Sequence, residues 1–389
     1  MRKLILKNHQ APGDVLMLTA AVRDLHRQHP GEFQTVARTT AKALWENNPH
    51  VKDEGRGMKE EGWEVIDCKY PLIHRSNTEP WHFIHAFHHF LGERLGVRLE
   101  PGAFRGDIHL SAREKSWMSQ VQEITGVALP FWIVVSGGKR DFTAKWWEPA
   151  RMQAVVDHFR GRILFVQAGS AEHHHPALRG VLDLRGKTDT RQFVRLMHHA
   201  QGVVCPVTFP MHLAAAVDTR GKCAAYPQGM PGNRPCVVIA GGREPVQWEA
   251  YPHHQYLHTN GALRCCDNGG CWKSRTVPLG DGDKKDEPAR LCTNVVHLRD
   301  PALSFLRGAK EPVPAHAAAD APGRRAEDFL PRCMDLITAE EVIRRISLYF
   351  DGGAVRHLTT EQWRICEETI AGLADGRANR ASQKAKVIA

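Results

Sequence analysis

The sequence predicts an α/β protein made of two successive units, each with a parallel sheet covered by helices. Two observations predict this fold class. Short apolar segments alternate with amphipathic segments of helical period, which is typical of βαβ units. The alternation runs through residues 1–130 and starts again at residue 131. With 389 residues, the chain is long enough for two or three domains of ordinary size.

The first unit opens with a short apolar segment that is expected to be a strand. The segment after it carries apolar side chains at helical spacing, so a helix is expected to follow. The same alternation continues to residue 124. Strands are predicted at 3–7, 34–38 and 63–67, and helices at 15–26, 40–46, 80–95 and 111–124.

The second unit begins with a continuous apolar run that ends in a glycine pair, as expected for a buried strand of a parallel sheet. Residues 274–328 are rich in Gly, Pro and charge and are expected to form loops or insertions. Two helices and a basic tail follow, and Thr338 is the expected N-cap of the first helix. Strands are predicted at 131–136, 163–166, 181–184, 203–207 and 236–240, and helices at 149–159, 190–200, 210–217, 339–349 and 360–371.

These elements predict four parts of the chain. The first domain spans 1–130, and the second spans 131–310 with a Cys-rich loop insertion at 263–295. Residues 311–328 are the expected linker, and 329–389 the expected C-terminal helices and basic tail.

Composition favours an ordinary globular protein. Hydrophobic residues make up 42% and charged residues 24%, which excludes wholesale disorder and a coiled coil. No window approaches the roughly 18 uncharged apolar residues that a membrane helix needs. The apolar run at 4–6 is too short for a signal peptide, so a soluble cytoplasmic protein is expected.

The net charge of +9 raises the question of an anionic partner. Eight of the nine excess positive charges fall within 131–319, whereas the two flanking regions are nearly balanced. An anionic ligand is therefore expected in the second unit.

A first motif, QAPGDVLMLTAAV at 10–22, follows the first strand directly. A strand, a glycine turn and a helix place Gly13 and Asp14 at the carboxyl edge of the sheet, where open α/β sheets bind ligands. Asp14 at a helix start is either a functional carboxylate or simply an N-cap. The segment is neither a dinucleotide fingerprint nor a Walker A sequence.

A second motif, VVSGGKRDFTAKWW at 134–147, places three cations after a buried strand: Lys139, Arg140 and Lys145. Exposed backbone N–H groups beside a lysine suit a diphosphate, although a solvated loop with surface charges is the alternative. The adjacent Trp146 and Trp147 argue against that alternative, because aromatic side chains need burial or a stacking partner.

A third motif, VVCPVTFPMHLAAAV at 203–217, joins a strand to a helix that begins at Pro210. Thr208 and His212 are expected to face the cleft edge. Taken alone, His212 has the alternative of a core or capping histidine.

In this order and at this separation, the three motifs resemble glycosyltransferase family nine, the ADP-heptose-dependent heptosyltransferases of GT-B fold with two Rossmann-like domains. NNPHV at 47–51 and the CMDLITAEEV segment at 333–342 extend the resemblance over nearly the whole chain. It implies an N-terminal domain that binds the acceptor and a C-terminal domain that binds the nucleotide sugar.

The resemblance also implies roles for individual residues. Asp14 is the implied general base, and Lys145 would neutralise the donor diphosphate. No metal is needed for the transfer itself. Further donor-binding residues carried over from the resemblance are Gly13, Ser136, Gly137, Gly138, Glu172, Thr188, Thr208, Met211 and His212.

Two positions depart from the family pattern. The family usually has Asp, then Ser or Thr, then Gly before the third helix, and this chain has Val207, Thr208 and Phe209. The loss of that carboxylate and glycine points to a different sugar or to a weakened enzyme.

The cysteines divide into two groups. Cys266, Cys271, Cys292 and Cys333 form a spaced set that could bind Zn²⁺ or iron and hold the loop-rich insertion, and Cys265 competes with Cys266. The set resembles the cysteine-bound iron finger of bacterial autotransporter heptosyltransferases; free buried thiols are the alternative. Ordinary core positions are expected for Cys68, Cys205, Cys223, Cys236 and Cys366.

Two histidine groups are open to interpretation. His82, His85, His88 and His89 lie at helical spacing, where a partly buried interface or acceptor wall is a better explanation than a metal site. The run at 173–175 is expected in a loop that could face the nucleotide.

The leading hypothesis is an inverting glycosyltransferase that moves a sugar, plausibly heptose from ADP-heptose, to a hydroxyl of a glycan, a lipopolysaccharide core or a protein. The alternatives are a nucleic-acid-binding protein with a four-cysteine metal site and a catalytically silent GT-B scaffold. No nucleic-acid module is recognisable in the sequence, so no nucleic-acid partner is expected. A homo-oligomer is an open expectation.

Overall fold

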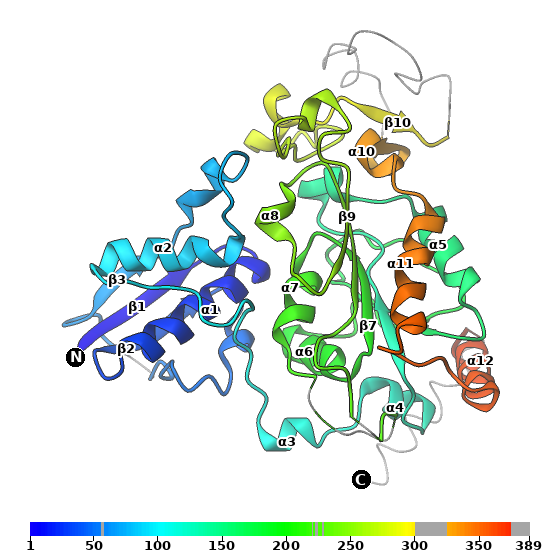
Figure 1. Ribbon diagram of the computed structural model, residues 1–389, viewed down its shortest axis with the longest axis horizontal. Helices are drawn as coiled ribbons and strands as arrows, with labels where there is room; N and C mark the ends of the chain where they lie inside the picture. Colours follow the sequence, from blue (N-terminus) through cyan, green and yellow to red (C-terminus); the bar gives the residue numbers. More distant parts are fainter. Residues whose placement is uncertain (56–57, 220, 222–224, 228, 300–324, 375–389) are drawn as a thin grey trace.

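The computed structural model describes residues 1–389 except 56–57, 220, 222–224, 228, 300–324 and 375–389. Two parallel sheets lie next to one another, each flanked by helices (Figure 1). The predicted α/β class with two Rossmann-like units is confirmed. The exact domain bounds stay a prediction, and most of the expected linker at 311–328 and the basic tail from 375 lie outside the described residues.

The first unit has three parallel strands in the order β2-β1-β3. The central strand carries Leu4, Ile5 and Leu6, which are fully buried because helices cover the sheet on its faces. Helices α1 and α2 pack against each other. The elements are β1 (Arg2–Asn8), α1 (Pro12–Gln28), β2 (Phe33–Thr39), β3 (Glu64–Asp67) and α2 (Phe83–Leu95).

The second unit has six parallel strands in the order β6-β5-β4-β7-β8-β9. The chain order reverses next to β4, and open α/β sheets bind ligands at such switch points. The strands are β4 (Phe131–Val134), β5 (Leu164–Gln167), β6 (Leu182–Asp183), β7 (Gly202–Pro206), β8 (Cys236–Gly241) and β9 (Gln255–His258).

Helices of the second unit follow its strands, and two longer helices close the described chain. The first of these two is capped as expected, because the Thr338 side chain accepts a hydrogen bond from the N–H of Glu341. The helices are α5 (Pro149–His158), α6 (Thr190–His199), α7 (Phe209–Ala216), α8 (Val246–Glu249), α10 (Arg332–Asp335), α11 (Ala339–Asp351) and α12 (Thr360–Ala374).

The segment expected as one helix at 111–124 is two short helices, α3 (Ala112–Lys115) and α4 (Gln120–Thr125). Ser116 ends the first helix and Ser119 starts the second, where its side chain accepts the N–H of Gln122. The two serines, three residues apart, thus end one helix and begin the next. The apolar periodicity of the segment did not indicate this break. The segment expected as a helix at 40–46 is a 3₁₀ turn at Lys42–Trp45.

The insertion after β9 contains more structure than the loops that were expected. It contains short 3₁₀ turns at Arg264–Cys266, Lys284–Asp286 and Pro288–Arg290. An antiparallel pair of strands follows them, β10 (Val295–His297) and β11 (Phe329–Pro331). The fully buried Arg275 guanidinium pairs with Asp141, Asp281 and Asp286. A buried arginine paired with several carboxylates holds this segment without a large apolar core.

The two units contact each other closely. Helix α1 packs against α7, and a Cβ at Gly13 would lie 3.3 Å from the ring of His212, so only glycine fits comfortably at this crossing. The rings of Phe83 and Trp248 stack at 5.3 Å across the same boundary. The carboxyl edges of both sheets therefore meet in one place.

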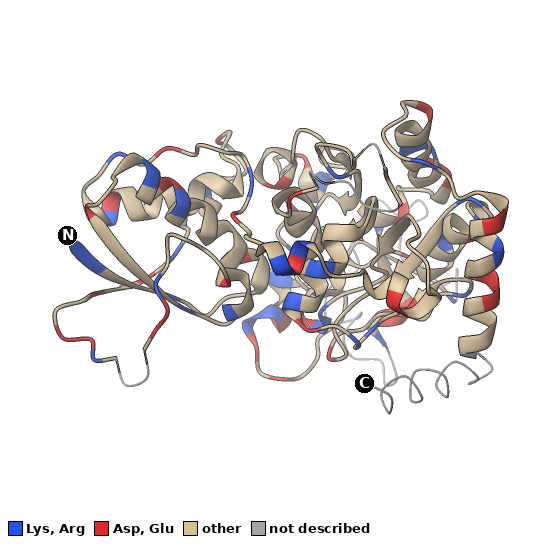
Figure 2. Ribbon diagram, turned by 90° about the horizontal axis from the view of Figure 1, so that it is seen from below, with Lys and Arg blue, Asp and Glu red and all other residues tan. Residues whose placement is uncertain are grey.

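Charges of both signs are interspersed over the face shown in Figure 2. In the part of the chain that is described, every helix is too short or too polar to cross a lipid bilayer. The cytoplasmic location expected from the sequence stays a prediction.

Candidate active site

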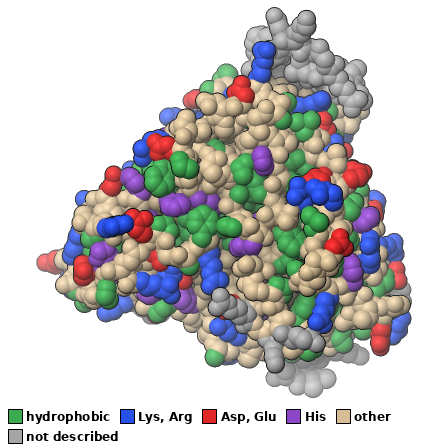
Figure 3. Space-filling model, in the orientation of Figure 1, with side chains coloured by type: hydrophobic (Ala, Val, Ile, Leu, Met, Phe, Trp, Pro, Cys, Tyr) green, Lys and Arg blue, Asp and Glu red, His purple; other side chains and the backbone are tan. Residues whose placement is uncertain are grey.

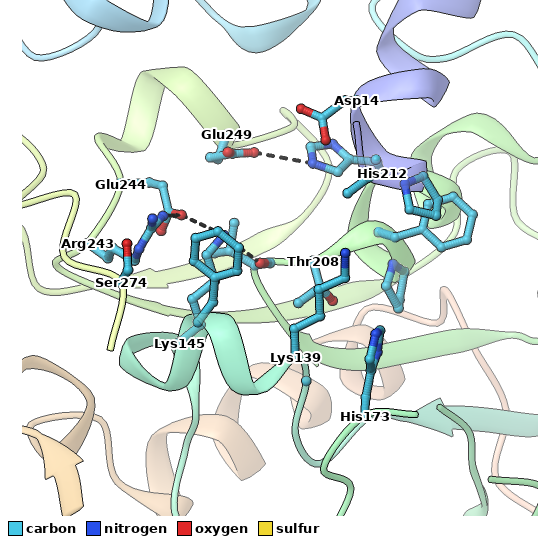
Figure 4. Close-up of a pocket in the computed structure, with 18 of the residues that line it drawn as sticks. Asp14, Lys139, Lys145, His173, Thr208, His212, Arg243, Glu244, Glu249 and Ser274 are labelled. Atoms are coloured by element: carbon cyan, nitrogen blue, oxygen red, sulfur yellow. Dashed lines mark hydrogen bonds and ion pairs between the residues drawn. The ribbon is translucent and has the colours of Figure 1, made fainter. Parts of the chain in front are cut away.

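A cavity of about 1230 Å³ lies where the two units meet. Asp14 reaches it from the first unit, and Lys145 and Thr208 reach it from the second (Figure 4). Tyr70 also lines it from the first unit. Most of the residues that the sequence singled out for acceptor and donor chemistry line this one cavity. They are Gly13, Asp14, Gly137, Gly138, Lys145, Glu172, Thr188, Thr208 and His212.

Two of the predicted donor-binding residues do not line the cavity. The hydroxyl of Ser136 donates to the carbonyl of Pro176 at 3.0 Å and accepts from the amide of Gln167 at 2.7 Å, so it holds two loops together. The side chain of Met211 is fully buried in the core because it points into the sheet from α7.

Asp14 sits in the first turn of α1, where the helix dipole favours a carboxylate. It is not the N-cap, because Ala11 holds that position. Burial raises the pKa of Asp14, and the hydroxyl of Tyr70, which donates to the carboxylate, offsets part of that rise, as does the positive charge of Lys145. The result is a carboxylate whose pKa lies above its ordinary value, as suits a general base.

Lys145 ends the 3₁₀ turn at Arg140–Lys145. Its Nζ atom donates to the backbone oxygen of Val207 at 3.2 Å and pairs with Glu244 Oε1 at 2.6 Å. Together with Arg243, it lies over the ring of Phe142, at 5.6 and 5.2 Å from the ring centre. Two cations over one ring form a positive wall of the cavity that suits an anionic leaving group.

The tryptophan pair next to Lys145 is buried, as expected from its aromatic character. Trp146 stacks on His174 with ring centres 4.5 Å apart, and the indole N–H of Trp147 donates to the backbone oxygen of Ile337 at 3.0 Å. These contacts fix the turn that presents Lys145.

His212 is buried between two polar groups. Its Nδ1 lies 2.9 Å from the hydroxyl of Tyr251, and its Nε2 lies 3.4 Å from Glu249 Oε2 (Figure 4). Burial lowers the pKa of His212 to about 3, so its imidazole is neutral at pH 7. Burial, followed by the neighbouring Glu244 carboxylate, raises the pKa of Glu249, so this carboxyl tends to stay protonated.

Glu244, Glu249 and Arg243 were missed by the sequence analysis. β8 ends at Gly241, and Gly242, Arg243 and Glu244 follow it directly, whereas Glu249 is the last residue of α8. A glycine pair at the carboxyl end of a buried parallel strand was the available signal, since that edge is where the first three motifs also converge. Nothing in the residue spacing indicated that two glutamates there would be buried.

The predicted nucleoside side of the cavity is formed by loops after β5 and β6. Glu172 is exposed there and Thr188 is half-buried. His173 and His175 also line the cavity, and burial lowers the pKa of His175 to about 4. The loop at 173–175 thus lines the cavity, and its place beside a nucleotide stays a prediction.

The Cys-rich insertion supplies one wall of the cavity. Trp272, Ser274, Lys284, Lys285 and Arg290 line it from this segment. Positive side chains from the insertion therefore stand near those of Lys145 and Arg243, and Lys285 Nζ lies 5.7 Å from the ring centre of Phe142.

The predicted metal ligands gather next to the Gly241-Gly242 pair. A Cβ at Gly242 would lie 2.8 Å from the sulfur of Cys266 and 3.5 Å from the Cβ of Cys333. Thiols at 265, 271 and 333 influence the pKa of Cys292, which burial raises. No group of three or more His, Cys, Asp or Glu side chains within the described ranges is arranged to hold a metal ion. The thiols at 266 and 333 lie beside Gly242, but they and the neighbouring thiols are not arranged as a metal site, and the metal stays a prediction.

The histidines of α2 are accounted for by packing. His88 Nε2 lies 2.9 Å from Asp24 Oδ2, His82 contacts the ring of Tyr251 at 5.0 Å, and His85 lies against Trp81. Figure 3 shows hydrophobic and histidine side chains gathered over this helix. The arrangement is the partly buried interface expected from the sequence.

The structure is that of an α/β protein with two Rossmann-like domains and a cavity where they meet. Residues 104–222 match the family model described as glycosyltransferase family 9 (heptosyltransferase), which confirms the resemblance found in the sequence. No curated protein sequence is similar enough to count as a relative.

Two similar solved structures are of TibC from enterotoxigenic Escherichia coli. One is described as an iron-containing dodecameric glycosyltransferase, with 17% identity, a TM-score of 0.52 and coverage of 90% of this chain and 76% of that chain. The other is the heptosyltransferase in complex with ADP-D-β-D-heptose, with 16% identity and the same TM-score of 0.52 and coverage of 90% and 76%. At these identities the likeness shows the fold, which is GT-B.

Proposed function

We propose that this protein is an inverting glycosyltransferase that moves a sugar from a nucleotide-sugar donor to an acceptor hydroxyl, with ADP-heptose as the favoured donor. The observation that carries the proposal is that Asp14 of the first unit and Lys145 of the second face one cavity. The family match and the ADP-heptose complex of TibC support an ADP-type donor and a heptose.

The proposed reaction uses the carboxylate of Asp14 and the positive charges of Lys145 and Arg243. Asp14 takes the proton of the acceptor hydroxyl, and the acceptor oxygen forms a bond to the anomeric carbon of the sugar. The bond from that carbon to the diphosphate oxygen breaks, and its electron pair leaves with the diphosphate. Lys145 and Arg243 stabilise the negative charge that develops there, because they stand in a partly dehydrated cavity where fixed charges act strongly. Attack opposite the leaving group inverts the anomeric centre.

The acceptor class is open among a glycan, a lipopolysaccharide core and a protein hydroxyl, and the resemblance of the cysteine set to autotransporter heptosyltransferases favours a protein. TibC is described as dodecameric, which supports a homo-oligomer for this chain.

The cysteine set is proposed to hold a structural Fe or Zn ion through Cys266, Cys271, Cys292 and Cys333, with Cys265 as the alternative to Cys266. The description of TibC as iron-containing and the convergence of the thiols on Gly242 support this. When bound, such an ion supplies a structural crosslink and takes no part in sugar transfer. Because the insertion lines the cavity, the crosslink would hold that wall in place.

The direct test is the release of ADP from ADP-heptose in the presence of cell extract as the acceptor source, with the anomeric configuration of the product determined by NMR. We expect turnover by the wild type, an inverted product, and loss of turnover in Asp14→Asn. Lys52→Ala, an exposed site outside the cavity, serves as the control. Failure to turn over any ADP-, GDP-, UDP- or CDP-sugar would refute the transferase proposal.

A further inference from the structure

Lys145 has a carboxylate partner that comes from an unexpected strand. The family pattern places an aspartate after β7, where this chain has Val207. In the structure, Lys145 Nζ donates a hydrogen bond to the backbone oxygen of Val207 at 3.2 Å. Its charge is instead balanced by Glu244, which follows the neighbouring strand β8 and reaches Nζ with Oε1 at 2.6 Å. Lys145 is thus paired with a carboxylate that follows β8, not one that follows β7.

Among the described residues, only one of the two oxygens of Glu244 has a partner. Oε1 accepts from both Lys145 and Arg243. Oε2 is buried and finds no hydrogen-bond partner among the residues that the structure describes. The residue lines the cavity and is only 2% exposed. A buried carboxylate oxygen without a donor is costly, so a donor from a ligand is the natural complement.

A second carboxyl stands beside it with a free oxygen as well. Glu249 Oε2 lies 3.4 Å from His212 Nε2 but, within the described residues, makes no hydrogen bond. The charges of Glu244, Lys145 and Asp14 all influence the pKa of Glu249, and all four residues line the same cavity. Figure 4 shows Glu244 and Glu249 along one side of the cavity.

The sugar of the donor has to occupy this stretch. In an in-line transfer, the acceptor oxygen at Asp14 and the diphosphate at Lys145 lie on opposite sides of the anomeric carbon. Such a transfer places the sugar ring between these two residues, and Glu244 and Glu249 line the same cavity. Carboxylates that accept from hydroxyls are common sugar-binding groups, because each accepts a charge-assisted hydrogen bond.

We propose that Glu244 is a specificity-determining residue that binds a hydroxyl of the donor sugar through Oε2 while Oε1 fixes Lys145 against the diphosphate. This inference rests on the proposed function. The proposed sugar-hydroxyl site is thus Glu244, which follows β8, in a chain that has no carboxylate directly after β7. Glu249 lies next to that site.

The test compares ADP with ADP-heptose and ADP-glucose by isothermal titration calorimetry, using the full-length wild type and Glu244→Gln. The affinity of the better ADP-sugar is expected to fall ~10- to 100-fold in Glu244→Gln, because the glutamine loses the oxygen that accepts from the sugar. The affinity of ADP is expected to change little, because the remaining glutamine oxygen still accepts from Lys145. Glu148→Gln removes a glutamate that pairs with Arg151 at 2.8 Å outside the cavity and is the matched control. Glu244→Asp keeps the charge but shortens its reach, and it is expected to show a smaller loss confined to the sugar.

The possible results separate the proposed function from the sugar-binding role of Glu244. If the wild type binds no nucleotide or nucleotide sugar, the proposed function fails. If the wild type binds both ADP and an ADP-sugar but the Glu244 variants lose both equally, Glu244 serves only to hold Lys145, and the sugar-binding inference is overturned. Unchanged affinity for the ADP-sugar overturns it as well. If Glu244→Gln does not fold, as judged by circular dichroism, Glu244→Asp alone gives the same comparison.

Discussion

Asp14 and Lys145 come from different sheets, yet they are close enough for the lysine charge to lower the pKa of the aspartate and offset part of the rise that burial causes. The base and the leaving-group cation are therefore electrostatically linked across the boundary between the two units. A substitution at either residue should act on a different step of the same reaction.

Asp14→Asn keeps the shape of the side chain but removes the base. We expect transfer to fall by about 10²- to 10⁴-fold, while donor binding persists because the amide does not contact the diphosphate. Turnover and calorimetric affinity measured on the same preparation check this. A variant that loses donor binding and turnover together would place Asp14 in the donor site.

Tyr70→Phe changes the pH dependence. The Tyr70 hydroxyl lowers the pKa of Asp14, so its removal raises that pKa further and leaves less ionised base at a given pH. The acid limb of kcat/KM should move to higher pH, with the largest loss at low pH and recovery toward alkaline pH.

Tyr349→Phe, whose hydroxyl donates to the backbone oxygen of His253 at 3.1 Å outside the cavity, is the control for that measurement. An acid limb that stays in place in Tyr70→Phe would show that Asp14 is not the group that titrates.

The cysteine variants test the metal. Single Ser substitutions at Cys271, Cys292 and Cys333 should each lower the Fe or Zn content and the melting temperature, because the insertion loses its crosslink. Cys265→Ser and Cys266→Ser, compared side by side, identify the fourth ligand by loss of metal.

Cys68→Ala, in the core of the first unit, should keep the metal. Protein purified without a metal column that contains less than about a tenth of an equivalent of Zn plus Fe would refute the site. Stabilisation by an ADP-sugar should also weaken in the cysteine variants, since Lys285 and Trp272 of the insertion line the cavity.

Much of the fold could be predicted because burial leaves a clear pattern in parallel sheets. β4 and β8 are continuous apolar runs, and they were placed within a residue or two of their bounds. β9 was missed because its sequence, QYLH, is half polar and lies at the sheet edge. The β10–β11 pair was missed because its strands have only three residues each and are separated by a long segment.

The candidate site could likewise be predicted only in part. Gly13, Lys145 and His212 could be placed in the cavity because each follows a strand end in a local motif. Glu244 and Glu249 could not, since they are buried against partners distant in sequence, Lys145 and His212. Local spacing carries no information about such partners.

The melting temperature of the protein with ADP-, GDP-, UDP- and CDP-sugars tests the central claim most directly. Ligand at 100 times its dissociation constant adds about 2.7 kcal/mol of stability, enough for a measurable rise. We expect a rise with an ADP-sugar that survives in Asp14→Ala and weakens in Lys145→Ala. No rise with any of the four nucleotide sugars would contradict the account.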